Sequence, residues 1–422
     1  MGYSRRDFLT LAGMGLLGCS AGKGQLISGK NGSPRPPNVV LILSDDLGYA
    51  DIGIHGCEDI PTPHIDSVAH DGVHFTDGYV SSPLCSPTRA GLMTGRYQQR
   101  FGWEKNPPWP VPSPAMCLDE ITMAEIMQSA GYRTGLIGKW HLGLDNGYHP
   151  TERGFDEYYG LEDFWQTGPG TAYLRNEKYI TDVLTHKARE FIDNNADRPF
   201  FLFVSHLAVH TPWEATPEYL ERFPHIEDPE RKTYAAMVSA LDDGVGQVRE
   251  ALRKNRIEEE TLVFFLNDNN GWTNDPLRGH KGQMYEGGIR VPFLACWPGT
   301  IQAGQVCETP VISLDILPTA AAMAQARIPE DRPMDGVNLL PILTGKERDL
   351  PREYLFWRVG QDGACRHGAW KLVVQGNKEE MYNLEADPGE EEDLIGKVPD
   401  IHERLRAAYD EWQGHMMPPP IR

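Results

Sequence analysis

The chain has 422 residues, of which 40% are hydrophobic, and it carries a formal net charge of −20. This length is enough to bury a large core and to form two or three domains. The negative charge argues against nucleic acid or a broad anionic surface as a partner, so an anionic substrate needs a local basic pocket to attract it.

The N-terminus has the pattern of an export signal. Arg5 and Arg6 precede a short apolar stretch, interrupted by glycines, that ends in Leu-Leu-Gly-Cys and is too short to span a bilayer. Residues 1–18 resemble a twin-arginine signal peptide ending in a lipobox. We expect export by that route, a lipid anchor on Cys19 and a periplasmic or cell-surface location. Residues 19–37, rich in Gly, Ser, Lys and Pro, are expected to form a flexible tether.

The first predicted strand covers residues 39–43 and leads directly into Asp45 and Asp46. A pair of aspartates after a strand is by itself weak support for a metal site, because such pairs commonly cap helices or form Asx turns. A metal site at this pair would therefore need further ligands from elsewhere in the chain.

Residues 85–96 form the most informative stretch of the chain. Ser86 suits a helix N-cap, Pro87 the first turn and Gly95 the C-terminal stop, so a short helix is predicted to begin just after Cys85. The N-terminus of a helix favours an anion, and Arg89, one turn on, can reach the same anion. The alternative is a buried structural cysteine followed by a helix start.

Three later apolar runs, at 133–137, 200–204 and 262–266, also end in polar clusters. Helical patterns at 123–130 and 234–252 separate the runs, which indicates buried strands of an α/β sheet. In such sheets, sites gather at the carboxyl ends of the strands. The clusters hold these candidate residues: Lys139 and His141 after the first run, His206 and His210 after the second, and Asp268 and Asn269 after the third.

The acidic residues predict a metal site. Asp45, Asp46, Asp268 and Asn269 supply oxygen ligands without a thiolate or imidazole, which suits Ca²⁺ or Mg²⁺ rather than Zn²⁺. These residues alone do not decide between the two ions.

The basic residues predict an anion pocket. Lys139, His141, His210 and Lys281 would each, taken singly, be ordinary surface or loop residues, but they are concentrated at strand ends. His206 is interpreted as structural. His280 is a candidate substrate contact.

Cysteine usage does not indicate a disulfide framework. The chain has seven cysteines, and setting aside Cys19 and Cys85 leaves an odd number. Cys296 and Cys307 flank a turn rich in Pro and Gly and can bridge, but the sequence leaves their pairing open.

The C-terminal part has a different pattern, with short aromatic-rich runs at 354–357, 370–374 and 381–384 and a helix predicted over 400–412. The acidic run 390–393 is interpreted as a solvated loop. Arg366 and His367 are candidates to reach the substrate pocket, and the segment containing Trp103 and Trp109 is a candidate to stack on a sugar.

The run Cys-x-Pro-x-Arg followed by Ala-Gly-Leu-Met-Thr-Gly-Arg at 85–96 resembles the signature of the type I sulfatases, members of the alkaline phosphatase superfamily. Matching motifs run from residue 38 to beyond residue 380. The resemblance implies an α/β fold with a large mixed sheet flanked by helices, in a catalytic domain at 38–347. It also implies a smaller subdomain of antiparallel sheet and helix at 348–422.

The resemblance further implies that a maturation enzyme converts Cys85 to formylglycine and that one Ca²⁺ is bound. The ligands would be Asp45, Asp46, Asp268, Asn269 and the residue at position 85. The family usually has Asp-Asn-Gly where this chain has Asp-Asn-Asn-Gly at 268–271, so the choice of Asn269 over Asn270 is open.

Roles in catalysis also follow from the resemblance. An aldehyde hydrate at position 85 would attack sulfur in line, with Asp268 close enough to help remove its proton. The charge that develops on the leaving oxygen would be stabilised by the metal and by Arg89, Lys139 and Lys281.

Two histidines would then move protons. His210, or Lys281, would protonate the departing alcohol, and His141 would take a proton from the second hydroxyl and expel sulfate.

The sequence therefore predicts a sulfuric ester hydrolase that acts on a sulfated small molecule or glycan. The main alternative is a phosphonate or phosphodiester hydrolase of the same superfamily. A second alternative is a lipid-tethered binder of sulfated glycans with a degenerate site. A cysteine hydrolase is disfavoured because no Cys-His-Asn pattern competes with the motif at 85–96.

Overall fold

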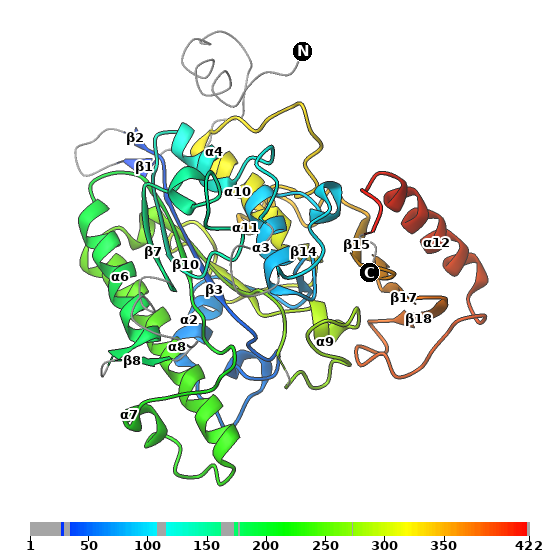
Figure 1. Cartoon of the computed structure of the whole chain (residues 1–422), viewed down its shortest axis with the longest axis horizontal. Coiled ribbons are helices and arrows are strands. Elements are labelled where there is room, and N and C mark those ends of the chain that lie inside the picture. Colours follow the sequence, from blue (N-terminus) through cyan, green and yellow to red (C-terminus); the bar gives the residue numbers. More distant parts are fainter. Residues whose placement is uncertain are drawn as a thin grey trace.

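The computed structural model describes residues 34–107, 115–161, 173–175, 178–271 and 273–419, together with the pair 27–28. Its main body has three layers, a central sheet between two sets of helices, and a smaller sheet with its own helix lies at one side (Figure 1). This architecture confirms the α/β prediction.

The central sheet has eight strands in the order β13-β4-β12-β11-β3-β10-β6-β7. The strands β11, β3, β10, β6 and β7 run parallel, whereas β12 is antiparallel to β11 and β4, so the sheet is mixed. Its strands are β3 (Asn38–Ser44), β4 (Val73–Phe75), β6 (Arg133–Gly138), β7 (Glu157–Gly160), β10 (Phe200–Ser205), β11 (Thr261–Asn267), β12 (Phe293–Cys296) and β13 (Gln305–Cys307).

Both faces of the sheet are covered because alternate residues of its strands point to opposite sides. Along β3, Val40 and Ile42 pack with one set of helices, and Val39, Leu41 and Leu43 pack with the other. The first set is α2 (Pro63–His70), α6 (Ile180–Asn195) and α8 (Pro229–Lys254). The second set is α3 (Cys85–Thr94), α4 (Met123–Ser129) and α10 (Ile316–Ala324).

The C-terminal part forms a separate four-stranded antiparallel sheet, β15-β16-β17-β18, packed against α12 (Pro399–Gly414). The sequence patterns missed β16 because polar and apolar residues alternate only weakly along it. The run predicted at 381–384 overlaps the end of β18, which begins at residue 378. The strands are β15 (Tyr354–Val359), β16 (Asp362–His367), β17 (Trp370–Gln375) and β18 (Lys378–Asn383).

Short elements complete the structure. They are the strands β1 (Ile27–Ser28), β2 (Pro34–Arg35), β5 (Gly78–Tyr79), β8 (Leu174–Arg175), β9 (Lys178–Tyr179) and β14 (Val311–Ile312), and the helices α7 (Pro217–Leu220), α9 (Glu286–Ile289) and α11 (Leu340–Leu343).

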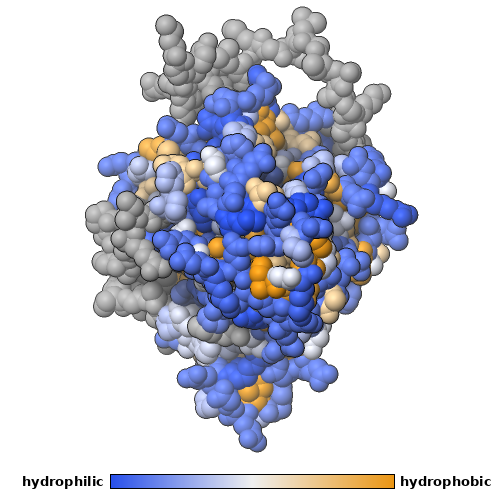
Figure 2. Space-filling model, turned by 90° about the vertical axis from the view of Figure 1, so that its right-hand side faces the viewer, coloured by the Kyte–Doolittle hydropathy of each residue, from blue (hydrophilic) through white to orange (hydrophobic). Residues whose placement is uncertain are grey.

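The face of the molecule that carries the C-terminal subdomain is mostly hydrophilic, with small separate hydrophobic patches (Figure 2). Among the described residues, no helix combines the length and apolar character that a membrane span requires. The predicted signal peptide at 1–18 and the lipidated Cys19 lie outside the described residues. Within the predicted tether, Ile27–Ser28 pairs with Pro34–Arg35.

The structure answers one question that the sequence left open and corrects one interpretation. Cys296 and Cys307 do not form a disulfide, and the other cysteines in the described part of the chain are also free. The acidic run at 390–393 is only partly solvated, because Glu390 is fully buried and pairs with Lys371.

Candidate active site

The carboxyl ends of four parallel strands are aligned at one edge of the central sheet. Ser205 at the end of β10 is in register with Leu43 of β3 and with Gly138 of β6, and Ser44 of β3 is in register with Asn267 of β11. The polar residues that follow these strands therefore meet at one edge, as the sequence predicted.

Cys85 is the first residue of α3, at the end where the first backbone N–H groups lack partners within the helix. The prediction of Ser86 as N-cap was wrong, because Leu84 occupies that position. The hydroxyl of Ser86 donates instead to the carbonyl of His141, 2.7 Å away, and accepts from Nε1 of Trp103 at 2.8 Å. These bonds hold the start of the helix beside the strand ends.

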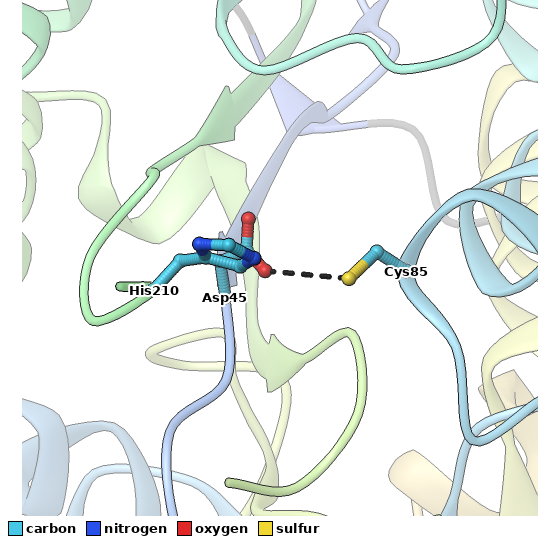
Figure 3. Close-up of side chains that lie close together, drawn as sticks. All are labelled: Asp45, Cys85 and His210. Carbon is cyan, nitrogen blue, oxygen red and sulfur yellow. Dashed lines mark hydrogen bonds between the residues drawn. The ribbon is translucent and has the colours of Figure 1, made fainter. Parts of the chain in front are cut away.

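Three carboxylates surround the Cys85 side chain. One ligand atom from each of Asp45, Asp46, Cys85 and Asp268 can be chosen so that all lie within 4.8 Å of one another. The sulfur of Cys85 donates to Oδ1 of Asp45 at 3.6 Å (Figure 3). Figure 3 also shows that Asp45 follows a strand, Cys85 begins a helix and His210 comes from a loop, so separate elements build the cluster.

Two cations bind the buried carboxylates of this cluster. Arg89 donates from Nε and Nη2 to Oδ2 of Asp268 at 3.0 and 2.8 Å, and Nη2 also lies 3.5 Å from Oδ2 of Asp45. Nζ of Lys139 pairs with Asp45. Arg89, Asp45 and Asp268 are essentially inaccessible to solvent, so their charges are screened little by water.

The third cation, Lys281, comes from the loop after β11. Its Nζ lies 2.7 and 2.8 Å from the two carboxylate oxygens of Asp46. Burial alone lowers the pKa of Lys281, but the nearby carboxylates of Asp46 and Asp45 outweigh burial and raise this pKa well above its usual range. Lys281 therefore stays positively charged.

The two central carboxylates differ in pKa. Burial opposes the ionisation of Asp45, but the charges of Lys139, His210 and Arg89 hold its pKa well below the usual range. Burial and the neighbouring charge of Asp45 raise the pKa of Asp268. Asp268 is thus the carboxylate of the pair that more readily takes a proton.

The thiol of Cys85 is poorly suited to act as a thiolate. Burial raises its pKa well above the usual range, and the charge of Asp268 adds to this effect. Cys85 lies at a helix N-terminus with cations nearby, features that lower the pKa of cysteine nucleophiles, but here burial and the surrounding carboxylates outweigh them.

Asn269 fits the cluster as a further oxygen ligand. Its Nδ2 donates to Oδ1 of Asp46 at 2.6 Å, whereas its Oδ1 is buried without a hydrogen-bond partner among the described residues. Asn270 also has a buried, unpartnered Oδ1, but its Nδ2 donates to the carbonyl of Arg290. The contact of Asn269 with Asp46 therefore favours Asn269.

Two of the predicted histidines lie beside the cluster. Nε2 of His210 is 3.6 Å from Oδ2 of Asp46, and the side chain is 31% exposed, so His210 lies between the cluster and solvent. Nδ1 of His141 is buried without a hydrogen-bond partner in the described structure. Burial and the charge of Lys139 lower the pKa of His141 well below its usual value, so it is neutral and able to accept a proton.

The alternative histidines have different surroundings. His206 is fully buried, burial lowers its pKa to about 4, and neither ring nitrogen has a partner among the described residues. Nδ1 of His280 contacts the carbonyl of Lys281 at 3.0 Å.

Three positioning residues received no role from the sequence. The hydroxyl of Ser205 accepts from Nη1 of Arg89 at 2.5 Å and donates to the carbonyl of Lys139 at 2.7 Å. Asn267 joins the loops after β3 and β11 by accepting from the backbone of Leu47, and Asn106 accepts from the N–H of Ser86 at 2.9 Å. Their partners are distant in sequence, so no local pattern reveals them.

The candidate substrate contacts in the C-terminal sheet have partners that do not belong to the cluster around Cys85. Nη1 of Arg366 pairs with Asp77 at 3.1 Å, and His367 stacks on Tyr354 with ring centroids 4.6 Å apart. Trp103 supports Ser86, as described above, and Trp109 lies outside the described residues.

Comparisons with known proteins agree with this geometry. The family model described as sulfatase matches residues 37–326, and the model described as the C-terminal part of N-sulphoglucosamine sulphohydrolase matches residues 279–412. Arylsulfatase A of Homo sapiens is 32% identical, over 88% of this chain and 87% of the relative. N-acetylgalactosamine-6-sulfatase of Homo sapiens is 33% identical, over 77% of this chain and 69% of the relative.

Solved structures are also similar to this chain. Ps i-CgsB in complex with a k-i-k-neocarrahexaose is 34% identical with a TM-score of 0.84, and the match covers 91% of this chain and 94% of that chain. A phosphonate monoester hydrolase of Agrobacterium radiobacter is 21% identical with a TM-score of 0.69, over 90% of this chain and 95% of that chain. This second likeness shows a shared fold alone.

Proposed function

Since the chain belongs to the sulfatase family and is a sulfuric ester hydrolase, we propose that it removes sulfate from a sulfated carbohydrate. The observation that carries this proposal is the cluster around Cys85, in which three carboxylates and three cations meet at the start of α3. One similar structure holds a k-i-k-neocarrahexaose and one relative is named N-acetylgalactosamine-6-sulfatase, which supports a carbohydrate substrate.

In this proposal a maturation enzyme converts Cys85 to formylglycine. The buried thiol lies among carboxylates that oppose its ionisation, which supports a modified nucleophile over a thiolate. The hydrated aldehyde would supply two hydroxyl groups. The oxygen of one would attack sulfur and displace the alcohol, and loss of the proton from the other would re-form the aldehyde and release sulfate by breaking the bond between carbon and the sulfate oxygen.

The same cluster suits one Ca²⁺. Asp45, Asp46, Asp268, Asn269 and the residue at position 85 would hold the ion, since their donor atoms converge and the Oδ1 of Asn269 has no other partner in the described structure. When bound, Ca²⁺ supplies Lewis-acid stabilisation of the sulfate oxygens.

The remaining side chains bind the sulfate and move protons. Arg89, Lys139 and Lys281 stay charged and stabilise negative charge in a site with little water. His210, or Lys281, donates a proton to the leaving oxygen at the partly exposed side of the cluster. Neutral His141 accepts a proton at its free Nδ1.

Two measurements on one preparation test the chemistry. Protein expressed with a formylglycine-generating enzyme should show the formylglycine mass in the peptide containing position 85, and it should hydrolyse 4-nitrophenyl sulfate. Cys85→Ala should abolish turnover while far-UV circular dichroism stays unchanged. Full activity in protein whose position 85 is entirely thiol would contradict the mechanism.

We also propose that the protein is exported by the twin-arginine route and anchored through a lipid on Cys19, which rests on the sequence of residues 1–19. Changing Arg5 and Arg6 to Lys should leave precursor in the cytosol, and Cys19→Ala should prevent lipidation. Normal delivery and normal membrane association in these variants would refute the proposal.

A further inference from the structure

A cavity opens beside the candidate leaving-group acid. It has a volume of about 460 Å³ and is lined by Thr211, Trp213, Pro229, Glu230 and Thr233, a size within the range of small-molecule sites. His210, whose Nδ1 contacts the carbonyl of Thr211 at 2.6 Å, connects this cavity to the cluster around Cys85. His210 and the cavity are therefore neighbours, and a substrate whose leaving oxygen meets His210 can extend toward the cavity.

Trp213 is held rigidly at the cavity wall. Its Nε1 donates to the carbonyl of Val209 at 3.1 Å, and its ring packs edge to face on Tyr234 with centroids 5.3 Å apart. The hydroxyl of Tyr234 is in turn bonded to Asp51 at 2.6 Å. An indole fixed in this way offers an apolar surface without losing rotamer freedom on binding.

The polar groups of the cavity suit an uncharged, hydroxylated ligand. Glu230 is exposed at the start of α8 and has no hydrogen bond or ion pair among the described residues, so its carboxylate is free to accept from hydroxyl groups. The hydroxyl of Thr233 donates to the carbonyl of Pro229 at 2.8 Å and can still accept. Glu230 is the only charged residue among the five that line the cavity, so the lining opposes a second sulfate.

We propose that this cavity binds an unsulfated sugar ring next to the sulfated ring, and that the enzyme acts on an oligosaccharide with such a neutral neighbour. The indole of Trp213 stacks on the apolar face of the ring, and Glu230 and Thr233 accept from its hydroxyl groups. The assignment rests on the proposed function, because the position of the cavity matters only if the ester is cleaved beside His210.

The test compares three substrates of one enzyme preparation. The first is 4-nitrophenyl sulfate, and the second is the sulfated monosaccharide cleaved fastest among sulfates of galactose, N-acetylgalactosamine, glucosamine and fucose. The third is a disaccharide that joins this ring to an unsulfated hexose. The disaccharide should have a kcat/KM about tenfold above that of the monosaccharide, the gain expected for one stacked ring.

Variants of the lining residues test whether the cavity causes this gain in kcat/KM. Trp213→Ala, and Thr233→Phe, which fills the cavity, should each lower the ratio of disaccharide to monosaccharide kcat/KM toward one. Trp213→Phe keeps an aromatic surface but loses the bond to Val209, so it should retain most of the ratio. Glu230→Lys should favour a disaccharide sulfated on both rings, whereas the control Glu218→Lys, whose side chain is 81% exposed outside the cavity, should change no ratio.

The outcomes separate the two proposals. Absence of activity on all three substrates would refute the proposed function. Cleavage of 4-nitrophenyl sulfate together with equal kcat/KM on monosaccharide and disaccharide would overturn the sugar subsite alone. Cleavage of 4-nitrophenyl sulfate with no saccharide cleaved would overturn both the carbohydrate substrate and the subsite. A uniform loss on all substrates in Trp213→Ala and Trp213→Phe would show that Trp213 only positions the loop of His210, and would also overturn the subsite.

Discussion

The three cations around position 85 show how individual residues can build an anion site in a protein of net charge −20. Arg89, Lys139 and Lys281 each pair with a carboxylate of the cluster. Because each cation has a carboxylate partner, burial does not drive off its proton. The three cations therefore balance the three carboxylates of the cluster locally, whereas the field of the whole protein opposes an anion.

His210→Ala should slow the hydrolysis of sugar sulfates by about 100-fold or more, the contribution of a general acid, and should affect 4-nitrophenyl sulfate far less. A sugar alcohol needs a proton to leave, whereas an acidic phenol can leave without one. Steady-state kinetics on both ester types measures the difference. His225→Ala serves as the control, because His225 is exposed and contacts the carbonyl of Asp59 and the ring of Phe223, neither of which belongs to the cluster around Cys85. Equal losses on both esters would assign proton donation to another group, such as Lys281.

At the scale of elements, α3 depends on a sharp C-terminal stop. Gly95 has φ 64° and donates its N–H to the carbonyl of Gly91, so the chain can leave the helix in a conformation that favours glycine. This stop directs the chain away from α3 while Cys85, at the other end, stays beside the strand ends.

Gly95→Ala should destabilise the protein by more than Gly360→Ala. Both glycines have φ 64°, so each alanine costs about 1–2 kcal/mol in backbone strain. A Cβ on Gly95 would also lie 2.6 Å from the sulfur of Met334, whereas a Cβ on Gly360 would meet nothing within 4 Å. Urea denaturation of both variants measures the two losses, and a larger loss for Gly360→Ala would contradict this account.

The smaller sheet is joined to the catalytic body through a buried ionic contact. Lys371 of β17 is inaccessible to solvent, and its Nζ lies 2.8 Å from both Glu286 of α9 and Glu390. Burial raises the pKa of Glu390 to about 7, although Lys371 opposes this shift. One lysine does not neutralise two buried carboxylates, so Glu390 takes up a proton more readily in the folded protein than an exposed glutamate does.

Glu390→Gln should remove a pH dependence of stability. The folded-state pKa of about 7 lies above the unfolded value of about 4.3, so the protonated form of Glu390 contributes stability that is fully present below about pH 4.3. This contribution falls by about 1.4 kcal/mol per pH unit as pH rises toward 7. The unfolding free energy of the wild type should thus fall relative to that of Glu390→Gln between pH 5 and 7. Exposed Glu391→Gln is the control, and parallel pH profiles for wild type and Glu390→Gln would refute the assignment.

At the scale of the whole molecule, the candidate metal ligands come from segments far apart in the chain. Asp45 follows β3, position 85 begins α3 and Asp268 follows β11. Unfolding separates these ligands, so an ion that binds them binds the folded protein alone and stabilises it by mass action.

Ca²⁺ should therefore raise the melting temperature of chelator-treated protein, with about 2.7 kcal/mol of stabilisation when the ion is present at 100 times its dissociation constant. Asp46→Asn should weaken or abolish this shift, whereas Asp400→Asn, at an exposed position on α12, should retain it. Differential scanning calorimetry with and without Ca²⁺ measures the effect independently of activity. If adding Ca²⁺ to fully chelated protein leaves the melting temperature unchanged, this result would contradict the metal site.

Local patterns in the sequence were sufficient for much of the fold. The apolar runs at 39–43, 133–137, 200–204 and 262–266 all correspond to buried strands, because fully buried parallel strands need continuous apolar residues. Local patterns gave the wrong interpretation where contacts between residues distant in sequence determine the surroundings of a side chain. Ser86 looks like a helix cap but donates to His141, and Glu390 looks solvated but pairs with Lys371.

The sequence by itself determined the sulfatase family and the residue types of the candidate site, because strand ends and the motif at 85–96 are local in the chain. Only the tertiary structure decided which of these residues meet. The register of the parallel strands brings Asp45 and Asp268 to Arg89, and the packing of the loop after His210 against α8 forms the cavity at Trp213. Such contacts depend on how the layers pack, and no segment read alone contains that information.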